Sequence, residues 1–127
     1  MAINSDQDIV AARQRGRALA AGLGFSVVDC TLISTAISEL ARNIVSYARK
    51  GEISLQAIQN STVQGILIVA SDEGPGIQDL RQALRDGFST SGSLGLGLPG
   101  VRRLMDEFSI ASQPGRGTRV EVKKWRR

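Results

Sequence analysis

The chain has 127 residues, 42% of them hydrophobic and 22% charged, which is an ordinary composition for a globular protein, and we take residues 1–127 as a single domain. Its net charge of +4 is spread along the chain, and the one basic run, at the C-terminal end, holds a single aromatic residue, so we expect no nucleic-acid partner. The chain has no histidine, which excludes histidine-based catalysis and most zinc sites, and no apolar run long enough to cross a bilayer.

The first half of the chain predicts a short strand and two helices. Residues 2–4 are compatible with a short first strand. Apolar residues recur at helical spacing over 8–23 and again, over a wider face, over 29–50. Glycines follow each of these segments, as they commonly do at helix C-termini.

The second half predicts strands mixed with short helices. Strands are expected over 53–59 and 65–72, the second buried on both faces or nearly so, with a hairpin turn over 60–64. A short helix over 78–86, a loop over 87–97 and a helix over 99–107 follow, and strands over 108–112 and 118–124 close the chain. This order predicts an α+β fold, a two-layer α/β sandwich with helices on one face of a mixed β-sheet.

Glu39 and Asn43 are the first polar pair of interest. They are four residues apart on the second predicted helix, so they project from one side of it, away from the Ile33 and Ile37 stripe. Taken alone, such a pair is more often a solvated polar face than a site.

The segment Asp72-Glu73-Gly74-Pro75-Gly76 follows directly after the buried strand. A carboxylate there can accept a hydrogen bond from a ligand's amino group, and glycines let the main chain approach a flat ring. Taken alone, the segment also fits an ordinary Gly-Pro turn.

A glycine-rich stretch over 87–100 leads into a helix N-terminus, where main-chain N–H groups and the helix dipole favour an anion. No Gly-Lys-Ser/Thr follows, so it is not a Walker A loop, and it does not follow a first strand as the dinucleotide fingerprint does. A second glycine motif, Gly115-Arg116-Gly117-Thr118, lies in the last hairpin.

Together these motifs resemble, in order and spacing, the GHKL (Bergerat-fold) ATPase family of gyrase B, Hsp90, MutL and histidine-kinase catalytic domains. The resemblance implies that Asp72 holds the adenine amino group beside Gly76 and Thr118, that Asn43 binds Mg²⁺, and that Glu39 is the catalytic residue, which orients or deprotonates the attacking hydroxyl. Gly92, Gly95 and Gly97 would let the main chain of a lid wrap the phosphates. The implied ATP-binding residues are Asn43, Asp72, Gly74, Gly76, Ser91, Gly92, Leu94, Gly95, Gly97 and Thr118.

The predicted lid contains no lysine or arginine. A cation for the γ-phosphate would then come from Arg42, Arg102, Arg103 or a partner protein. A kinase built in this way is expected to be slow when isolated.

Within the family, several segments resemble the stressosome switch kinases, among them 8–14, 36–44, 86–92 and 97–108. This resemblance implies a serine/threonine protein kinase that uses ATP and Mg²⁺, acts on STAS-domain antagonist and scaffold proteins and, when released, activates a PP2C-type phosphatase. An anti-sigma factor kinase of the same fold and a non-catalytic docking module stay open as alternatives. Cys30 alone cannot form an intrachain disulfide, which suits a reducing compartment. Together with the lack of a membrane-spanning run, this leads us to expect a cytoplasmic protein.

Overall fold

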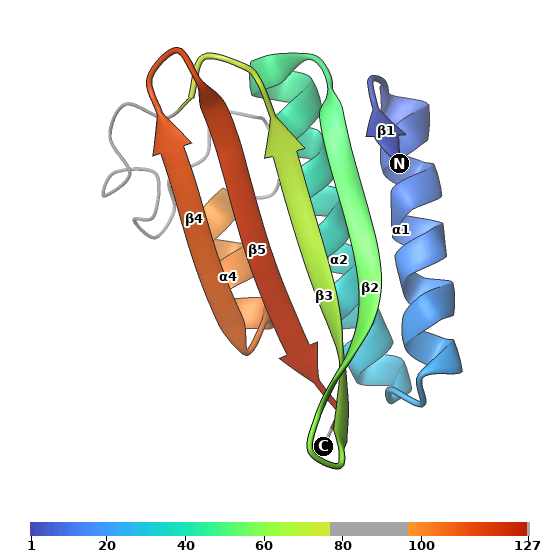
Figure 1. Ribbon diagram of the computed structural model, residues 1–127. Helices are drawn as coiled ribbons and strands as arrows, with labels where there is room; N and C mark the ends of the chain where they lie inside the picture. Colours follow the sequence, from blue (N-terminus) through green and yellow to red (C-terminus); the bar gives the residue numbers. More distant parts are fainter. Residues whose placement is uncertain (77–96, 127) are drawn as a thin grey trace.

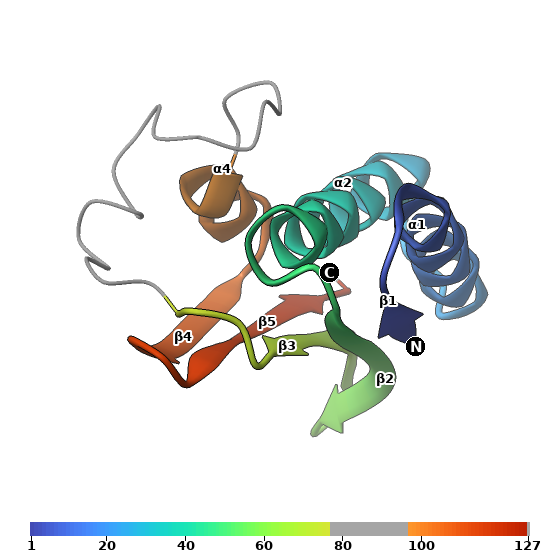
Figure 2. The ribbon, with the colours of Figure 1, turned by 90° about the horizontal axis from the view of Figure 1, so that it is seen from above.

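The computed structural model describes residues 1–76 and 97–126, and these residues form two layers (Figures 1 and 2). Helices α1 (Asp6–Gly22), α2 (Val27–Asn43) and α4 (Gly97–Leu104) lie on one face of a five-stranded sheet. The predicted helix over 78–86 and most of the predicted loop over 87–97 lie outside the described residues. Among the helices that are described, none has the length and apolar character to span a membrane.

The sheet is antiparallel throughout its described strands. These are β1 (Ala2–Ile3), β2 (Gly51–Asn60), β3 (Val63–Asp72), β4 (Glu107–Gln113) and β5 (Gly117–Trp125), in the order β1-β2-β3-β5-β4. The two-layer α+β prediction is confirmed, as is the short first strand, but the expected mixed sheet is wrong for these strands. Two tight hairpins supply four of the strands, and β5 also runs antiparallel to β3.

Serine caps fix the starts of the first two helices. Ser5 accepts a hydrogen bond from the main-chain N–H of Asp8 at 3.4 Å, and Ser26 accepts one from that of Asp29 at 3.1 Å. Both helices therefore begin two residues before the predicted starts.

The second helix also ends differently from the prediction. Regular α2 stops at Asn43, and residues Ile44–Ala48 continue as a π-helix, η1. Arg49 then takes a left-handed conformation with φ of 69°, so Lys50 lies outside the helix. Single-turn π-helices are rare and often lie at functional sites.

The core lies between the helices and the facing side of the sheet. Ile66 and Ile68 of β3 are fully buried on that side, and Val69, on the other side, is 8% exposed. The near-complete burial predicted for β3 is thus confirmed at Val69, whereas Leu67 is only half-buried.

Ile37 of α2 packs against Gly16 of α1. A Cβ at Gly16 of α1 would overlap the Ile37 side chain, so the glycine permits this close contact.

Ile37→Ala should lower the free energy of unfolding by about 2–5 kcal/mol, since a fully buried side chain leaves a cavity. The matched control is Val27→Ala on the same helix, where the side chain is 76% exposed and the change should stay within about 0.5 kcal/mol. Urea unfolding followed by circular dichroism measures both, and equal losses would contradict the assigned packing of Ile37.

Candidate nucleotide site

The end of β3, η1 and the β4–β5 turn meet at one end of the molecule (Figure 1). Asp72 lies opposite Thr118 of β5, which lies opposite Ser112 of β4. Residues opposite one another share a face of the sheet, and this is the helix-covered face of Ala70 and Val120, two residues away on the same strands. The three polar side chains therefore form a row at the end of the core.

Hydrogen bonds order this row. The Ser112 and Thr118 hydroxyl oxygens are 2.8 Å apart, and the Ser112 hydroxyl also donates to the Gly117 carbonyl at 3.1 Å. The Asp72 Oδ1 atom accepts from the Gly74 N–H at 2.9 Å. Within the described residues no hydrogen bond involves Asp72 Oδ2, which leaves an acceptor for a ligand's amino group.

Two glycines bring the loop after β3 against the last hairpin. Gly76 and Gly117 have φ of 76° and 93°. A Cβ at Gly76 would collide with the Gln113 carbonyl oxygen, and one at Gly117 with that of Asp72. The Gly115 N–H also donates to the Pro75 carbonyl at 2.7 Å. The loop after β3 and the glycine motif of the last hairpin therefore pack against each other, and neither is an isolated turn.

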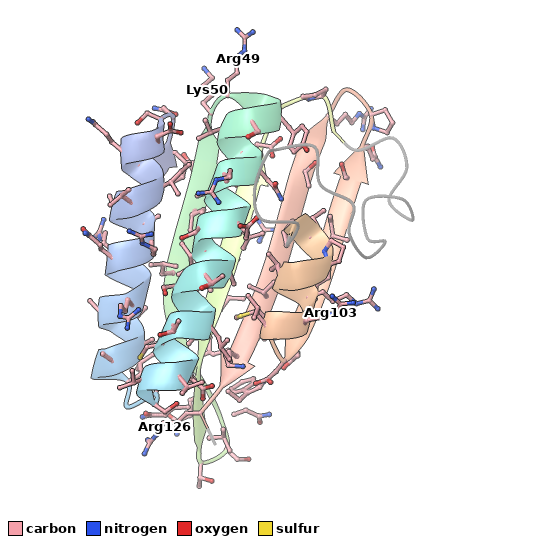
Figure 3. The ribbon with its side chains drawn as sticks, turned by 180° about the vertical axis from the view of Figure 1, so that it is seen from behind. Arg49, Lys50, Arg103 and Arg126 are labelled. Carbon is pink, nitrogen blue, oxygen red and sulfur yellow. The ribbon has the colours of Figure 1, made fainter. Side chains whose placement is uncertain are left out.

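The end of the π-helix η1 lies against the loop that follows β3. A Cβ on Gly74 would collide with Cβ and Cα of Ala48, so the main chain at Gly74 lies directly on the end of η1. Arg49 and Lys50 are exposed beyond it and project from this end of the molecule (Figure 3). Their charge favours a polyphosphate ligand near this end.

Glu39 is buried, with 4% of its surface exposed. Its Oε1 atom is 3.2 Å from Nη1 of Arg42, and among the described residues its buried Oε2 atom has no hydrogen-bond partner. A solvated polar face is therefore the wrong interpretation for Glu39. A buried carboxylate oxygen without a donor is costly, which is typical of an atom that meets a proton or a ligand during function.

Asn43 is half-buried at the last position of α2, one helical turn after Glu39. Oxygen atoms suit Mg²⁺, which proteins usually hold through one or two side chains together with substrate phosphates. Among the described residues, no group of three or more acidic, cysteine or histidine side chains could hold a metal ion.

The remaining predicted residues are only partly described. Ser91, Gly92, Leu94 and Gly95 lie outside the described residues, and Gly97 is the buried first residue of α4. Of the three proposed cations, Arg42 lies beside Glu39, whereas Arg102 and Arg103 are exposed on α4, and Figure 3 shows Arg103 extending outward.

The sequence interpretation overlooked two residues of this region, Ser112 and Ala48. Ser112 could have been found from the hairpin register, since it pairs with Thr118 across the turn. No sequence signal separates the π-helical Ala48 from a residue of a regular helix.

Asn43→Ala should weaken ATP binding about tenfold or more in Mg²⁺, because an interaction with a charged group is worth about 1.5–3 kcal/mol. Calorimetric titration with ATP in Mg²⁺ and then in EDTA should find the loss only in Mg²⁺. Asn60→Ala, at the exposed end of β2, is the control. An equal loss in both buffers would contradict the metal role.

Comparison with known proteins identifies the family of this chain. The family model "Histidine kinase-, DNA gyrase B-, and HSP90-like ATPase" matches residues 28–127. The chain is 56% identical to serine/threonine-protein kinase RsbT of Bacillus subtilis (strain 168) over 98% of this chain and 94% of that protein. It is 31% identical to the anti-sigma F factor of Caldanaerobacter subterraneus subsp. tengcongensis over 97% of this chain and 89% of that protein.

A solved structure of the mycobacterial sensor histidine kinase MprB superposes with a TM-score of 0.57 at 17% identity, covering 100% of this chain and 97% of that one. At this identity the likeness concerns the fold alone. The family match and the 56% identity also confirm the resemblance drawn from the motifs. The chain belongs to the family of histidine kinase-, DNA gyrase B- and HSP90-like ATPases.

Proposed function

We propose that this protein is an ATP-dependent serine/threonine protein kinase whose catalytic residue is Glu39. The observation that carries the proposal is the buried Glu39 carboxylate, with one oxygen atom unpaired among the described residues, one helical turn before Asn43. The 56% identity to a protein named as a serine/threonine kinase supports the same activity.

In the proposed reaction, Asp72 Oδ2 accepts a hydrogen bond from the adenine amino group, and Thr118 and Gly76 flank the base. A serine or threonine hydroxyl oxygen bonds to the γ-phosphorus as the bond to the bridging oxygen of ADP breaks, and Glu39 takes the hydroxyl proton. Bound Mg²⁺ would neutralise phosphate charge, with Asn43 as its protein ligand. Positioning and charge neutralisation supply most of the catalysis in such transfers.

The proposed substrates are STAS-domain antagonist and scaffold proteins, and the second proposed partner is a PP2C-type phosphatase that the released kinase activates. The greater likeness to RsbT than to the anti-sigma F factor, 56% against 31% identity, supports this proposal over the anti-sigma alternative. We further propose a cytoplasmic location and a single domain over residues 1–127. A co-purifying sigma factor in place of a STAS protein would favour the anti-sigma alternative.

Incubation with ATP, Mg²⁺ and a candidate STAS protein should place phosphate on a serine or threonine of that protein, detected by mass spectrometry. Of the three proposed cations, only Arg42 lies beside Glu39, and it is paired with that carboxylate. We therefore expect the partner to supply a cation for the γ-phosphate, so ADP formation should be slow for the kinase alone and rise when the STAS protein is added. The Asp72→Asn variant is the control.

Two outcomes would count against these proposals. Equal ATP consumption with and without the STAS protein would contradict the need for a partner. A wild-type protein that binds a phosphatase but phosphorylates no STAS protein would favour the non-catalytic docking module.

A further inference from the structure

The first strand covers only the beginning of β2. The Met1 amino group donates to the Ile53 carbonyl at 2.9 Å, and the Ile53 N–H donates to the Met1 carbonyl at 2.9 Å. β1 and β3 are the strand neighbours of β2 among the described residues, so from residue 54 to residue 60 one edge of β2 has no strand beside it. Hydrogen-bonding residues alternate along an antiparallel strand, which directs the main-chain groups of Leu55, Ala57 and Gln59 to this open edge.

A groove lies beside the open edge, between β2 and α1. It has a volume of about 450 Å³ and is lined by Met1, Arg15, Leu19, Ile53, Ser54 and Leu55. Figure 2 shows α1 and β2 at the side of α2 away from α4, with β1 between them. The groove thus combines a line of main-chain donors and acceptors, the apolar side chains of Leu19 and Leu55, and the cation of Arg15.

The open edge lacks the usual protection against pairing. Proteins commonly protect exposed edges with charged residues, proline or bulges. Residues 54–60 read Ser-Leu-Gln-Ala-Ile-Gln-Asn, with neither a charge nor a proline, whereas the other edge strand, β4, begins with Glu107. This part of β2 is therefore open to an added strand.

After its first turn, α1 carries only positive charges. From Ile9 to Gly22, α1 carries Arg13, Arg15 and Arg17 and no acidic residue, and all three arginines are exposed. Arg15 lines the groove, with Leu19 one turn later on the same side of the helix. An extended segment in the groove would meet this cation between apolar contacts at every second residue, because alternate side chains of a strand face one way.

We propose that this groove is a docking site for an extended acidic segment of a partner protein, which adds to the sheet as a strand antiparallel to β2, in line with β1. Its matching pattern is an acidic residue flanked at two-residue spacing by apolar residues. The main chain of Leu55 and Ala57 supplies the hydrogen bonds, and Arg15 supplies the charge preference. This site is separate from the proposed phosphoryl transfer and needs no nucleotide.

The probe is a blocked, fluorescent peptide, Ser-Val-Thr-Glu-Thr-Val-Ser, titrated by anisotropy against the 127-residue protein without ATP. Ala57→Pro removes an N–H that faces the open edge and should weaken binding at least about tenfold, while Ala57→Val should not. Arg15→Glu should also weaken binding about tenfold, and a peptide with lysine in place of glutamate should restore it. Arg13→Glu makes the same charge change outside the groove and should alter binding less than about threefold.

A second measurement covers the case in which Ala57→Pro does not fold. Peptides N-methylated at the positions that face β2 should lose binding to the wild-type protein, and peptides methylated at the alternate positions should keep it. Absence of saturable binding, or equal effects of both methylation patterns, would overturn the proposal. So would a dimer of this chain that Ala57→Pro separates, since a second copy would then be the occupant.

Discussion

Asp72→Asn should weaken ATP binding by roughly 10- to 100-fold and leave the fold intact, because a hydrogen bond to a charged group is worth about 1.5–3 kcal/mol. The carboxylate has Oδ1 bonded to the Gly74 N–H, and Oδ2 has no partner among the described residues. Asparagine matches the shape of aspartate and can keep the bond to Gly74 through its carbonyl oxygen. Its NH₂ group would then face the adenine amino group, so two donors would oppose each other.

The measurement is a calorimetric titration with ATP, and thermal unfolding without nucleotide checks the fold. Glu73→Gln is the matched control, because it removes the same charge from the next residue, which is exposed. Unchanged ATP affinity in Asp72→Asn would contradict the adenine assignment. Equal losses in both variants would indicate a general effect of charge.

Glu39→Gln should slow phosphoryl transfer to a STAS substrate by roughly 10²- to 10⁴-fold, the range usually lost with a general base. ATP affinity should change little, since the proposed contact of Glu39 is with the attacking hydroxyl and not with the nucleotide. Glutamine fills the same buried space and can still accept a hydrogen bond from Arg42, so packing at this position is conserved. Single-turnover transfer of radioactive phosphate measures the rate.

Glu52→Gln, at an exposed position on β2, controls for the loss of one negative charge. Arg42→Gln leaves the Glu39 carboxylate in place without its cation, so it separates the effect of the carboxylate from that of the ion pair. Full transfer activity in Glu39→Gln would contradict the catalytic assignment. Intact signalling in a variant that no longer transfers phosphate would favour the docking module. Loss of ATP binding in the Glu39→Gln variant would instead indicate that Glu39 contacts the nucleotide.

The amino-acid sequence predicted the elements that follow from local pattern. The helical stripes of α1 and α2 and the strands β2 and β3 were predicted close to their observed bounds. The errors are at helix ends, where Ser26 and the π-helix, rather than periodicity, decide the boundaries. The predicted mixed sheet was also wrong for the described strands, which are all antiparallel. Strand direction depends on pairing between segments far apart in the chain.

The candidate site divides in the same way. The sequence by itself pointed to Glu39, Asn43, Asp72 and the glycine motifs, since their residue types and order are visible in one dimension. Tertiary structure alone decided that Glu39 is buried beside Arg42 and that Ser112 continues the row from Asp72 and Thr118. Burial and register arise from contacts between distant segments, and local periodicity carries no information about them.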